Sequence, residues 1–167
     1  MIIILMGVTG AGKTAIGKML AEELEYAFYE GDEFHSQNNI EKMNHGIPLD
    51  DNDRLPWLLS IRGLIENCAQ EKKNAVITCS ALKSSYRSIL IKNENEINLI
   101  YLKGDRDMIQ TRLETRKNHF MNPGLLASQF DILEEPKNAI YADISKDEKT
   151  IVESIRLKLL GGQKNDI

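Results

Sequence analysis

The sequence predicts an α/β fold in which a five-stranded parallel sheet lies between two layers of helices. Short apolar runs alternate along the chain with longer segments whose apolar residues recur at helical spacing. The first run, Ile2–Met6, is apolar at every position, as expected of a strand that is covered on both faces. A glycine-rich turn follows this run and opens a helix. The 167 residues suit a single domain, residues 1–167, with a core of ordinary size.

The same periodicities give each element in chain order. The expected strands cover residues 2–6, 26–30, 75–79, 97–102 and 139–144. The expected helices cover residues 13–25, 40–45, 53–72, 84–92, 105–116 and 146–160, and residues 161–167 form a polar tail. The acidic run Asp50-Asp51-Asn52-Asp53 is the expected start of the third helix. If Asp53 is the cap, Pro56 lies in the first turn, where its missing N–H costs nothing.

Ligands of open parallel sheets bind at the carboxyl ends of the strands. Gly7, Asp32, Ser80 and Gly104 each follow an expected strand. We therefore expect these four residues to line one edge of the sheet, and the site to lie there.

Composition excludes several classes of partner. The net charge of −4 gives no sign of a nucleic-acid or membrane-binding surface. The apolar start is too short for a signal peptide or a membrane span. Cys68 and Cys79 have no zinc-ligand spacing and are expected to be reduced thiols in the core of a cytoplasmic protein.

The segment "GVTGAGKT" matches the pattern G-x-x-x-x-G-K-[ST] of a phosphate-binding loop (P-loop), and it stands between a strand and a helix. The predicted fold is therefore the three-layer P-loop NTPase fold, with ATP and Mg²⁺ as cofactors. Lys13 is expected to reach the β- and γ-phosphates, and the Thr14 hydroxyl to bind Mg²⁺. The alternative is a glycine-rich turn that arose by chance. The nucleotide-binding residues on this hypothesis are Gly7, Val8, Thr9, Gly10, Ala11, Gly12, Lys13 and Thr14.

A P-loop does not by itself name a reaction. The sequence has no N-K-x-D motif for reading guanine, and the strand at 75–79 continues into "CSALK" rather than into an acid. Small length and an acidic cluster after the second strand favour a kinase that acts on a small molecule or a nucleotide.

That acidic cluster is Glu30-Gly31-Asp32-Glu33, with His35 close behind. A kinase must orient an acceptor hydroxyl and help to remove its proton, and Asp32 is our candidate for this catalytic role. The Glu30 side chain, two residues earlier, points the same way as that of Asp32 if the strand continues, and could hold a water on Mg²⁺. The alternative is a solvated turn, which is the favoured interpretation for Glu33.

Seven segments together resemble one known family. They are "MGVTGAGKT", "GDEFH", "NIEKMNHGIPLDDNDRLPWL", "CSALKSSYR", "YLKGD", "RLETRKNHFM" and "SQFDILEEP", and they cover Met6 to Pro136 almost continuously. In order and spacing they resemble the gluconate kinases, P-loop sugar-acid kinases that are related to shikimate kinases. The resemblance implies ATP-dependent phosphorylation of D-gluconate at its 6-hydroxyl, and a homodimer. A kinase for another small acid, such as shikimate or another aldonate, and a nucleotide-binding regulator without transfer remain alternatives.

The chain departs from the family pattern at three positions. Members commonly have Asp where Glu30 stands, which puts the water-mediated Mg²⁺ role in question because Glu reaches farther. A proline often stands where this chain has Ser36, and a glycine where it has Asn118. We expect both of these changes to affect only turns.

Gluconate is an anion rich in hydroxyl groups, so its pocket needs a cation and several polar groups. Within the matching segments, Arg54 is the expected partner of the carboxylate because a guanidinium binds it in a two-pronged fork. Lys83, Arg87 and His35 are the further substrate-binding candidates. The alternatives are ordinary surface cations and, for His35, a turn residue. A metal role for His35 is not expected, because the other histidines share no ligand spacing with it.

A lid is expected at about residues 112–126, since a kinase must exclude water from the γ-phosphate. By resemblance, Arg116 meets the transferring phosphoryl group and is catalytic together with Lys13 and Asp32. Arg112 would then lie near the adenine, and Pro136 could wall the adenine pocket. The alternative for the two arginines is a solvated, basic helix end.

Overall fold

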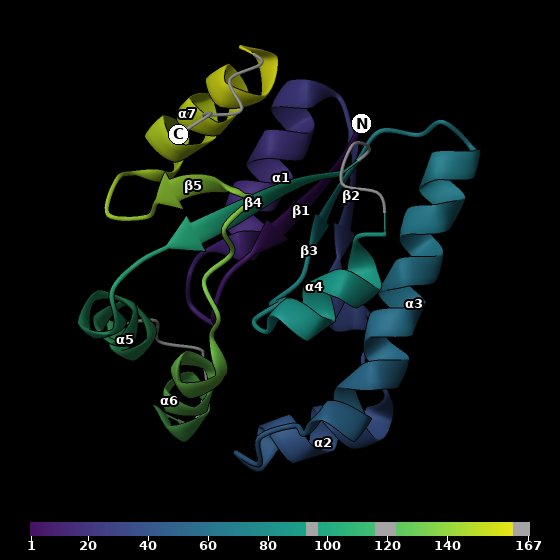
Figure 1. Ribbon diagram of the computed structural model, residues 1–167. Helices are drawn as coiled ribbons and strands as arrows, with labels where there is room; N and C mark the ends of the chain where they lie inside the picture. Colours follow the sequence, from purple (N-terminus) through teal and green to yellow (C-terminus); the bar gives the residue numbers. More distant parts are fainter. Residues whose placement is uncertain (93–96, 116–122, 162–167) are drawn as a thin grey trace.

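A computed structural model describes residues 1–92, 97–115 and 123–161 of the chain. The five strands form one parallel sheet in the order β2-β3-β1-β4-β5, with β1 in the centre (Figure 1). Ile4 at the centre of β1 is in register with Ile77 of β3 and Leu99 of β4. The strands are β1 Ile2–Met6, β2 Ala27–Glu30, β3 Ala75–Thr78, β4 Ile97–Lys103 and β5 Ile140–Asp143. The predicted five-stranded parallel sheet is therefore confirmed.

Helices connect the strands. They are α1 Lys13–Leu24, the 3-10 helix η1 Gly31–Phe34, α2 Gln37–Asn44, α3 Asp51–Gln70, α4 Ser84–Leu90, α5 Arg106–Thr115, α6 Pro123–Ile132 and α7 Glu148–Leu160. Among the helices of the described residues, none has the length and apolar character needed to cross a membrane.

Successive side chains of the central strands pack alternately into two separate hydrophobic cores, one on each face of the sheet. Ile3 and Leu5 of β1 point to the face that α1 and α7 cover, whereas Ile2 and Ile4 point to the face of α3 and α4 (Figure 1). All five residues of β1 are buried, because a strand between two helical layers has no face exposed to water. This double burial explains why the strand is apolar at every position.

The helix α3 begins earlier than expected. Asp50, not Asp53, is its cap: the Asp50 side chain accepts from the Asp53 amide, and the Asp53 side chain accepts from the Asp50 amide. The helix therefore starts within the acidic run, as predicted, and the reciprocal pair places Asp53 at the third helical position. Pro56 consequently lies inside the helix rather than in its first turn.

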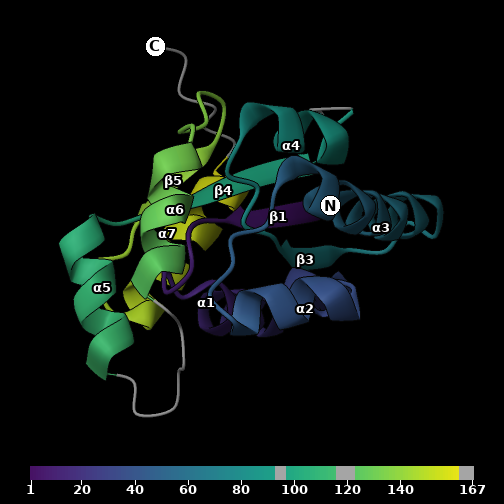
Figure 2. The ribbon, with the colours of Figure 1, turned by 90° about the horizontal axis from the view of Figure 1, so that it is seen from below.

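The short helices near the acidic cluster also differ from the expectation. The helix predicted at residues 40–45 begins at Gln37, because the Ser36 side chain accepts a hydrogen bond from the Asn39 amide. The 3-10 turn η1 was not predicted at all. Figure 2, which looks at the molecule from below the view of Figure 1, shows α2, α5 and α6 around this end of the molecule.

Candidate active site

The P-loop has the geometry of an anion-binding site. Gly12 caps α1 with φ at 91°, in the left-handed region that favours glycine. The Lys13 ammonium donates to the carbonyls of Gly7 and Val8, at 3.0 and 3.1 Å, so it lies across the loop. The amides at the start of α1 add positive potential at the same place. The loop is thus shaped to receive phosphate oxygens.

A helix from beyond the lid region contacts this loop. The Thr9 amide donates to the side-chain oxygen of Gln129 in α6, at 2.7 Å. No feature of the sequence pointed to Gln129 beyond its place in the "SQFDILEEP" segment. The contact fixes the middle of the P-loop to the element that follows residues 116–122.

Glu30 connects the P-loop to the neighbouring strand end. Its carboxylate accepts from the Thr14 hydroxyl at 2.5 Å and, through its other oxygen, from the Thr78 hydroxyl. Thr78 is fully buried at the end of β3 and also accepts from the Gly31 amide, at 3.0 Å. Thr14 and Glu30 therefore place two oxygen ligands side by side, which is the ligand type that Mg²⁺ prefers.

The turn that carries Asp32 is held tightly at Gly31. A side-chain carbon on Gly31 would lie 1.9 Å from the carbonyl oxygen of Thr78, so only glycine fits. The Gly31 carbonyl in turn accepts from the indole N–H of Trp57, at 2.7 Å. With both sides of Gly31 fixed, the exposed Asp32 is held as the second residue of the 3-10 helix that follows β2.

The charged groups of the site surround a buried thiol at the end of β3. Burial raises the pKa of Cys79 to about 12. The charges of Asp32 and Glu30 raise this pKa further and that of Lys13 lowers it, so all three groups lie within electrostatic reach of one point. Lys13, Glu30 and Asp32 thus all act on the same thiol, and the Cys79 thiol stays protonated and unreactive.

His35 lies against Trp57. The two rings stack with their centroids 4.2 Å apart and their planes at 15°. Burial lowers the pKa of His35, the nearby charge of Asp32 raises it and that of Arg54 lowers it, with burial the largest effect. The imidazole is therefore neutral at pH 7, and can both accept and donate a hydrogen bond.

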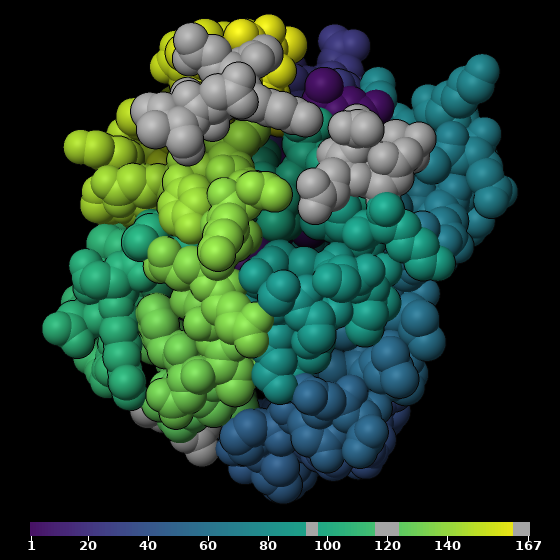
Figure 3. All heavy atoms as spheres, in the orientation of Figure 1, coloured from purple at the N-terminus to yellow at the C-terminus, as the bar shows by residue number. Residues whose placement is uncertain are grey.

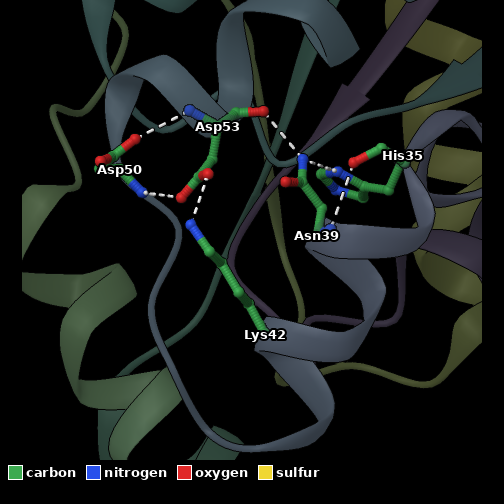
Figure 4. Close-up of polar contacts among 6 residues, drawn as sticks. His35, Asn39, Lys42, Asp50 and Asp53 are labelled. Carbon is green, nitrogen blue, oxygen red and sulfur yellow. Dashed lines mark hydrogen bonds and ion pairs between the residues drawn. The ribbon is translucent and has the colours of Figure 1, made fainter.

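The contact between α2 and the start of α3 positions His35 (Figure 4). Asn39 is 3 % exposed, its side-chain nitrogen donates to the Asp53 carbonyl at 2.8 Å, and it lies 3.3 Å from Nδ1 of His35. Lys42 adds an ion pair with Asp53 at 2.7 Å. Asn39 thus links the histidine to the same helix that carries Arg54.

Arg54 and Lys83 share one buried tyrosine. Nη1 of Arg54 donates to the Tyr86 hydroxyl at 3.3 Å, and Lys83 forms an ion pair with Asp51 at 2.8 Å. Both cations lie over the Tyr86 ring, at 5.6 and 5.4 Å from its centroid. Figure 3 shows the surface of this region, where the teal atoms that follow β3 adjoin the blue atoms of α2 and the start of α3. The two predicted cations therefore lie together.

Arg87 has a different setting from Lys83. Its Nη1 donates to the carbonyls of Ala81 and Leu82, at 2.9 and 3.0 Å, which holds the turn after β3. Ala81 in that turn is buried and has φ at 45°, a conformation unusual for a residue with a side chain. These contacts show that Arg87 stabilises the turn between β3 and α4, and its contact with substrate stays a prediction.

Arg112 lines a cavity of about 600 Å³ next to the P-loop, together with Gly12 and Lys146. Its guanidinium donates to the carbonyl of Ile144, at 2.5 Å. The structure does not bring Pro136 to this cavity: Pro136 is buried, and its carbonyl accepts from the Tyr141 hydroxyl at 2.7 Å. A contact of Pro136 with the adenine stays a prediction. Arg116 and most of the predicted lid, residues 116–122, lie outside the described residues.

Sequence reasoning missed four residues that shape the site: Asn39, Asp51, Trp57 and Tyr86. Trp57 is 2 % exposed, as a core residue of α3 would be, but its indole N–H also donates to the Gly31 carbonyl. Tyr86 stands in the segment "CSALKSSYR" and carries no signal that separates a core tyrosine from a site tyrosine. Asn39 as a polar residue in a short helix gave no signal either.

The fold and this edge of the sheet define a P-loop kinase that acts on a small molecule. A model of the shikimate kinase family matches residues 9–157. A probable gluconokinase of Dictyostelium discoideum is 49% identical, over 93% of this chain and 84% of that protein. The thermoresistant gluconokinase of Escherichia coli (strain K12) is 41% identical, over 92% of this chain and 90% of that protein.

Solved structures agree with these relatives. A gluconokinase from Sinorhizobium meliloti 1021 superposes with a TM-score of 0.84 at 34% identity, over 98% of this chain and 97% of that chain. The chain belongs to the gluconate kinase family of P-loop kinases, within the shikimate kinase group.

Proposed function

We propose that the protein is a gluconokinase that transfers the γ-phosphate of ATP to the 6-hydroxyl of D-gluconate, giving 6-phospho-D-gluconate and ADP. The observation that carries this proposal is the pairing of a P-loop with an acceptor site that holds Arg54 and Lys83 over one tyrosine. The gluconokinases among its relatives, at 41% and 49% identity over most of the chain, support gluconate as the acid.

The residues divide the work between the two substrates. Lys13 and the loop amides bind the triphosphate, and Arg112 lies beside the adenine. Asp32 orients the 6-hydroxyl and accepts its proton as the oxygen attacks, which is general-base catalysis. Arg54 and Lys83 hold the carboxylate end, His35 contacts a hydroxyl, and Arg87 shapes the turn that carries Lys83. A neutral His35 suits a hydroxyl, because an uncharged imidazole does not compete with Arg54 and Lys83 for the substrate carboxylate.

Mg²⁺ fits the oxygen pair formed by the Thr14 hydroxyl and the Glu30 carboxylate, 2.5 Å apart. The described residues hold no cluster of three or more acidic, histidine or cysteine ligands, which suits an ion that takes most of its ligands from phosphate and water. Bound there, the ion would neutralise the charge of the phosphates. Glu30 would hold the ion through a water molecule, which is the role that the sequence suggested for it.

The remaining parts of the proposal concern the lid and the assembly. Arg116 would meet the transferring phosphoryl group when a lid at about residues 112–126 closes. The protein would act in the cytoplasm as a homodimer. Sedimentation equilibrium of the full chain tests the oligomeric state directly.

The decisive experiment identifies the product that forms from gluconate, ATP and Mg²⁺ by mass spectrometry and NMR. We expect a phosphate on the 6-oxygen and stoichiometric ADP. The same coupled assay is run with shikimate and with other aldonates as acceptors. Turnover of another acid without turnover of gluconate would refute the substrate, and ATP binding without transfer to any acid would favour a regulator.

A further inference from the structure

The acceptor site contains an acid that the proposed roles leave without a task. Asp51, at the first position of α3, accepts from the Lys83 ammonium at 2.8 Å and from the Tyr86 hydroxyl. These two donors lower the pKa of Asp51, so the carboxylate is ionised at neutral pH. Its side chain is 65% exposed, and an ionised carboxylate has room for further donors.

Tyr86 connects this acid to the arginine. Its hydroxyl donates to Asp51 and accepts from Nη1 of Arg54, and the tyrosine itself is 4% exposed. Burial and the bond to Asp51 raise the pKa of Tyr86, which keeps the hydroxyl protonated and donating. The tyrosine therefore fixes the distance between the two charged groups.

The charges of Arg54, Lys83 and Asp51 together favour the binding of one anion. Arg54 and Lys83 are cationic and Asp51 is anionic, so the three side chains carry a net charge of +1. One substrate carboxylate balances this charge.

The spacing of Arg54 and Asp51 suits a substrate whose hydroxyl lies close to its carboxylate. Arg54 and Asp51 are bridged by a single oxygen atom, that of Tyr86, so they lie no more than two hydrogen bonds apart. A ligand that carries its carboxylate and its hydrogen-bond donor on neighbouring carbons can meet both groups. A 2-hydroxy acid has this arrangement.

We propose that Asp51 is a specificity-determining residue that accepts a hydrogen bond from the 2-hydroxyl of the acid, while Arg54 binds the carboxylate. Tyr86 is the positioning residue that holds Asp51 and Arg54 at the required separation. The identity of the acid as gluconate rests on the proposed function, whereas the selection of a 2-hydroxy acid rests on this cluster. A site built to bind a hydroxyl rejects the analogue that lacks it, because the polar group is then left without its partner.

A different role for Asp51 leads to a different result. If Asp51 only neutralises Lys83 until a substrate arrives, its removal strengthens binding of every carboxylate by a similar factor. The ratio of two affinities separates the two roles, since a general gain in attraction cancels in the ratio.

The test is calorimetric binding of gluconate and of 2-deoxygluconate, with ADP and Mg²⁺ present, to the wild type, Asp51→Asn and Glu153→Gln. Glu153 is an exposed acid on α7, so its variant is a control for the loss of one negative charge. We expect the wild type and Glu153→Gln to bind gluconate about tenfold more tightly than 2-deoxygluconate, as one hydrogen bond to a charged group gives. In Asp51→Asn this ratio should fall to about threefold or less.

Two results would overturn the assignment: a wild-type ratio near one, or an unchanged ratio in Asp51→Asn. A wild type that discriminates between the acids but forms no 6-phosphogluconate would refute the proposed function and leave the role of Asp51 standing. The binding ratio and the product assay therefore fail independently.

Tyr86→Phe tests the positioning role, because it keeps the ring beneath both cations and removes only the bridging hydroxyl. We expect KM for gluconate to rise about tenfold, with kcat and KM for ATP close to the wild-type values. An equal change in KM for both substrates would mean a general disturbance of the fold, and an unchanged KM for gluconate would exclude the positioning role.

Discussion

At the scale of single residues, the acidic cluster contains two neighbours with different expected roles. Asp32 and Glu33 are both exposed and both stand in η1. Asp32 lies close enough to the end of β3 to act on the pKa of Cys79, in common with Lys13 and Glu30. Glu33 is therefore a matched control for Asp32.

Asp32→Asn should lower kcat for gluconate phosphorylation by about 10²- to 10⁴-fold, because the amide cannot accept the hydroxyl proton. KM for ATP should change little, since the P-loop is intact. Steady-state kinetics measure both constants. Glu33→Gln should keep the wild-type kcat to within about twofold. A wild-type rate in Asp32→Asn would exclude the general-base role.

At the scale of elements, the site depends on how η1 meets β3. The Gly31 amide and carbonyl bind Thr78 and Trp57, and its Cα faces the backbone of Thr78 with no room for a side chain. The glycine in the acidic cluster is thus required by packing between two elements. Its place in the sequence showed a turn but could not show which backbone lies against it.

Gly31→Ala should destabilise the protein by about 3 kcal/mol, because a backbone atom must move to admit the methyl group. The melting temperature should fall by roughly 6–12 °C, as measured by calorimetry. Gly63→Ala is the control within α3: its added carbon would meet nothing within 4 Å, so it should raise the melting temperature by about 2–4 °C. Equal melting temperatures for the two variants would contradict the close approach at Gly31.

At the scale of the whole molecule, the dependence of stability on pH should reveal the buried imidazole. Burial places the pKa of His35 in the folded state below its unfolded value of about 6.5. Stability from the neutral ring is therefore complete above pH 6.5 and is lost as the pH falls through the folded pKa. Carboxylates whose pKa is lowered lose their contribution at a lower pH.

His35→Gln should consequently lose less melting temperature than the wild type between pH 6.5 and about 5. Calorimetry of the two proteins across this pH range measures both profiles. A His35→Gln profile that parallels the wild type would show that the imidazole does not titrate with folding.

The sequence predicted the sheet and the P-loop because both depend on local patterns. A strand buried on both faces is apolar throughout, and a P-loop needs glycines and a lysine at fixed spacing. The acidic run was correctly placed at the start of α3, but the cap within it was not fixed. Three aspartates, Asp50, Asp51 and Asp53, offer caps of equal quality, and only the reciprocal bonds decide between them.

The acceptor site was predictable only in part for a related reason. Arg54 and Lys83 were found as cations in separate segments, but their meeting over Tyr86 is a tertiary contact between α3 and the start of α4. The Pro136 carbonyl likewise accepts from the Tyr141 hydroxyl, a contact that its place in the sequence did not indicate. Sequence order gives no measure of such distances.

The bond from Thr14 to Glu30 has a consequence for what the P-loop can attract. A hydroxyl has one proton, and Thr14 gives that proton to Glu30. Its oxygen therefore turns only lone pairs toward the surroundings, and an approaching phosphate oxygen finds no donor there. The P-loop therefore has separate positions for the two kinds of ion before any ligand binds. Anions are attracted to the lysine and the amides, and a cation is attracted to the threonine oxygen.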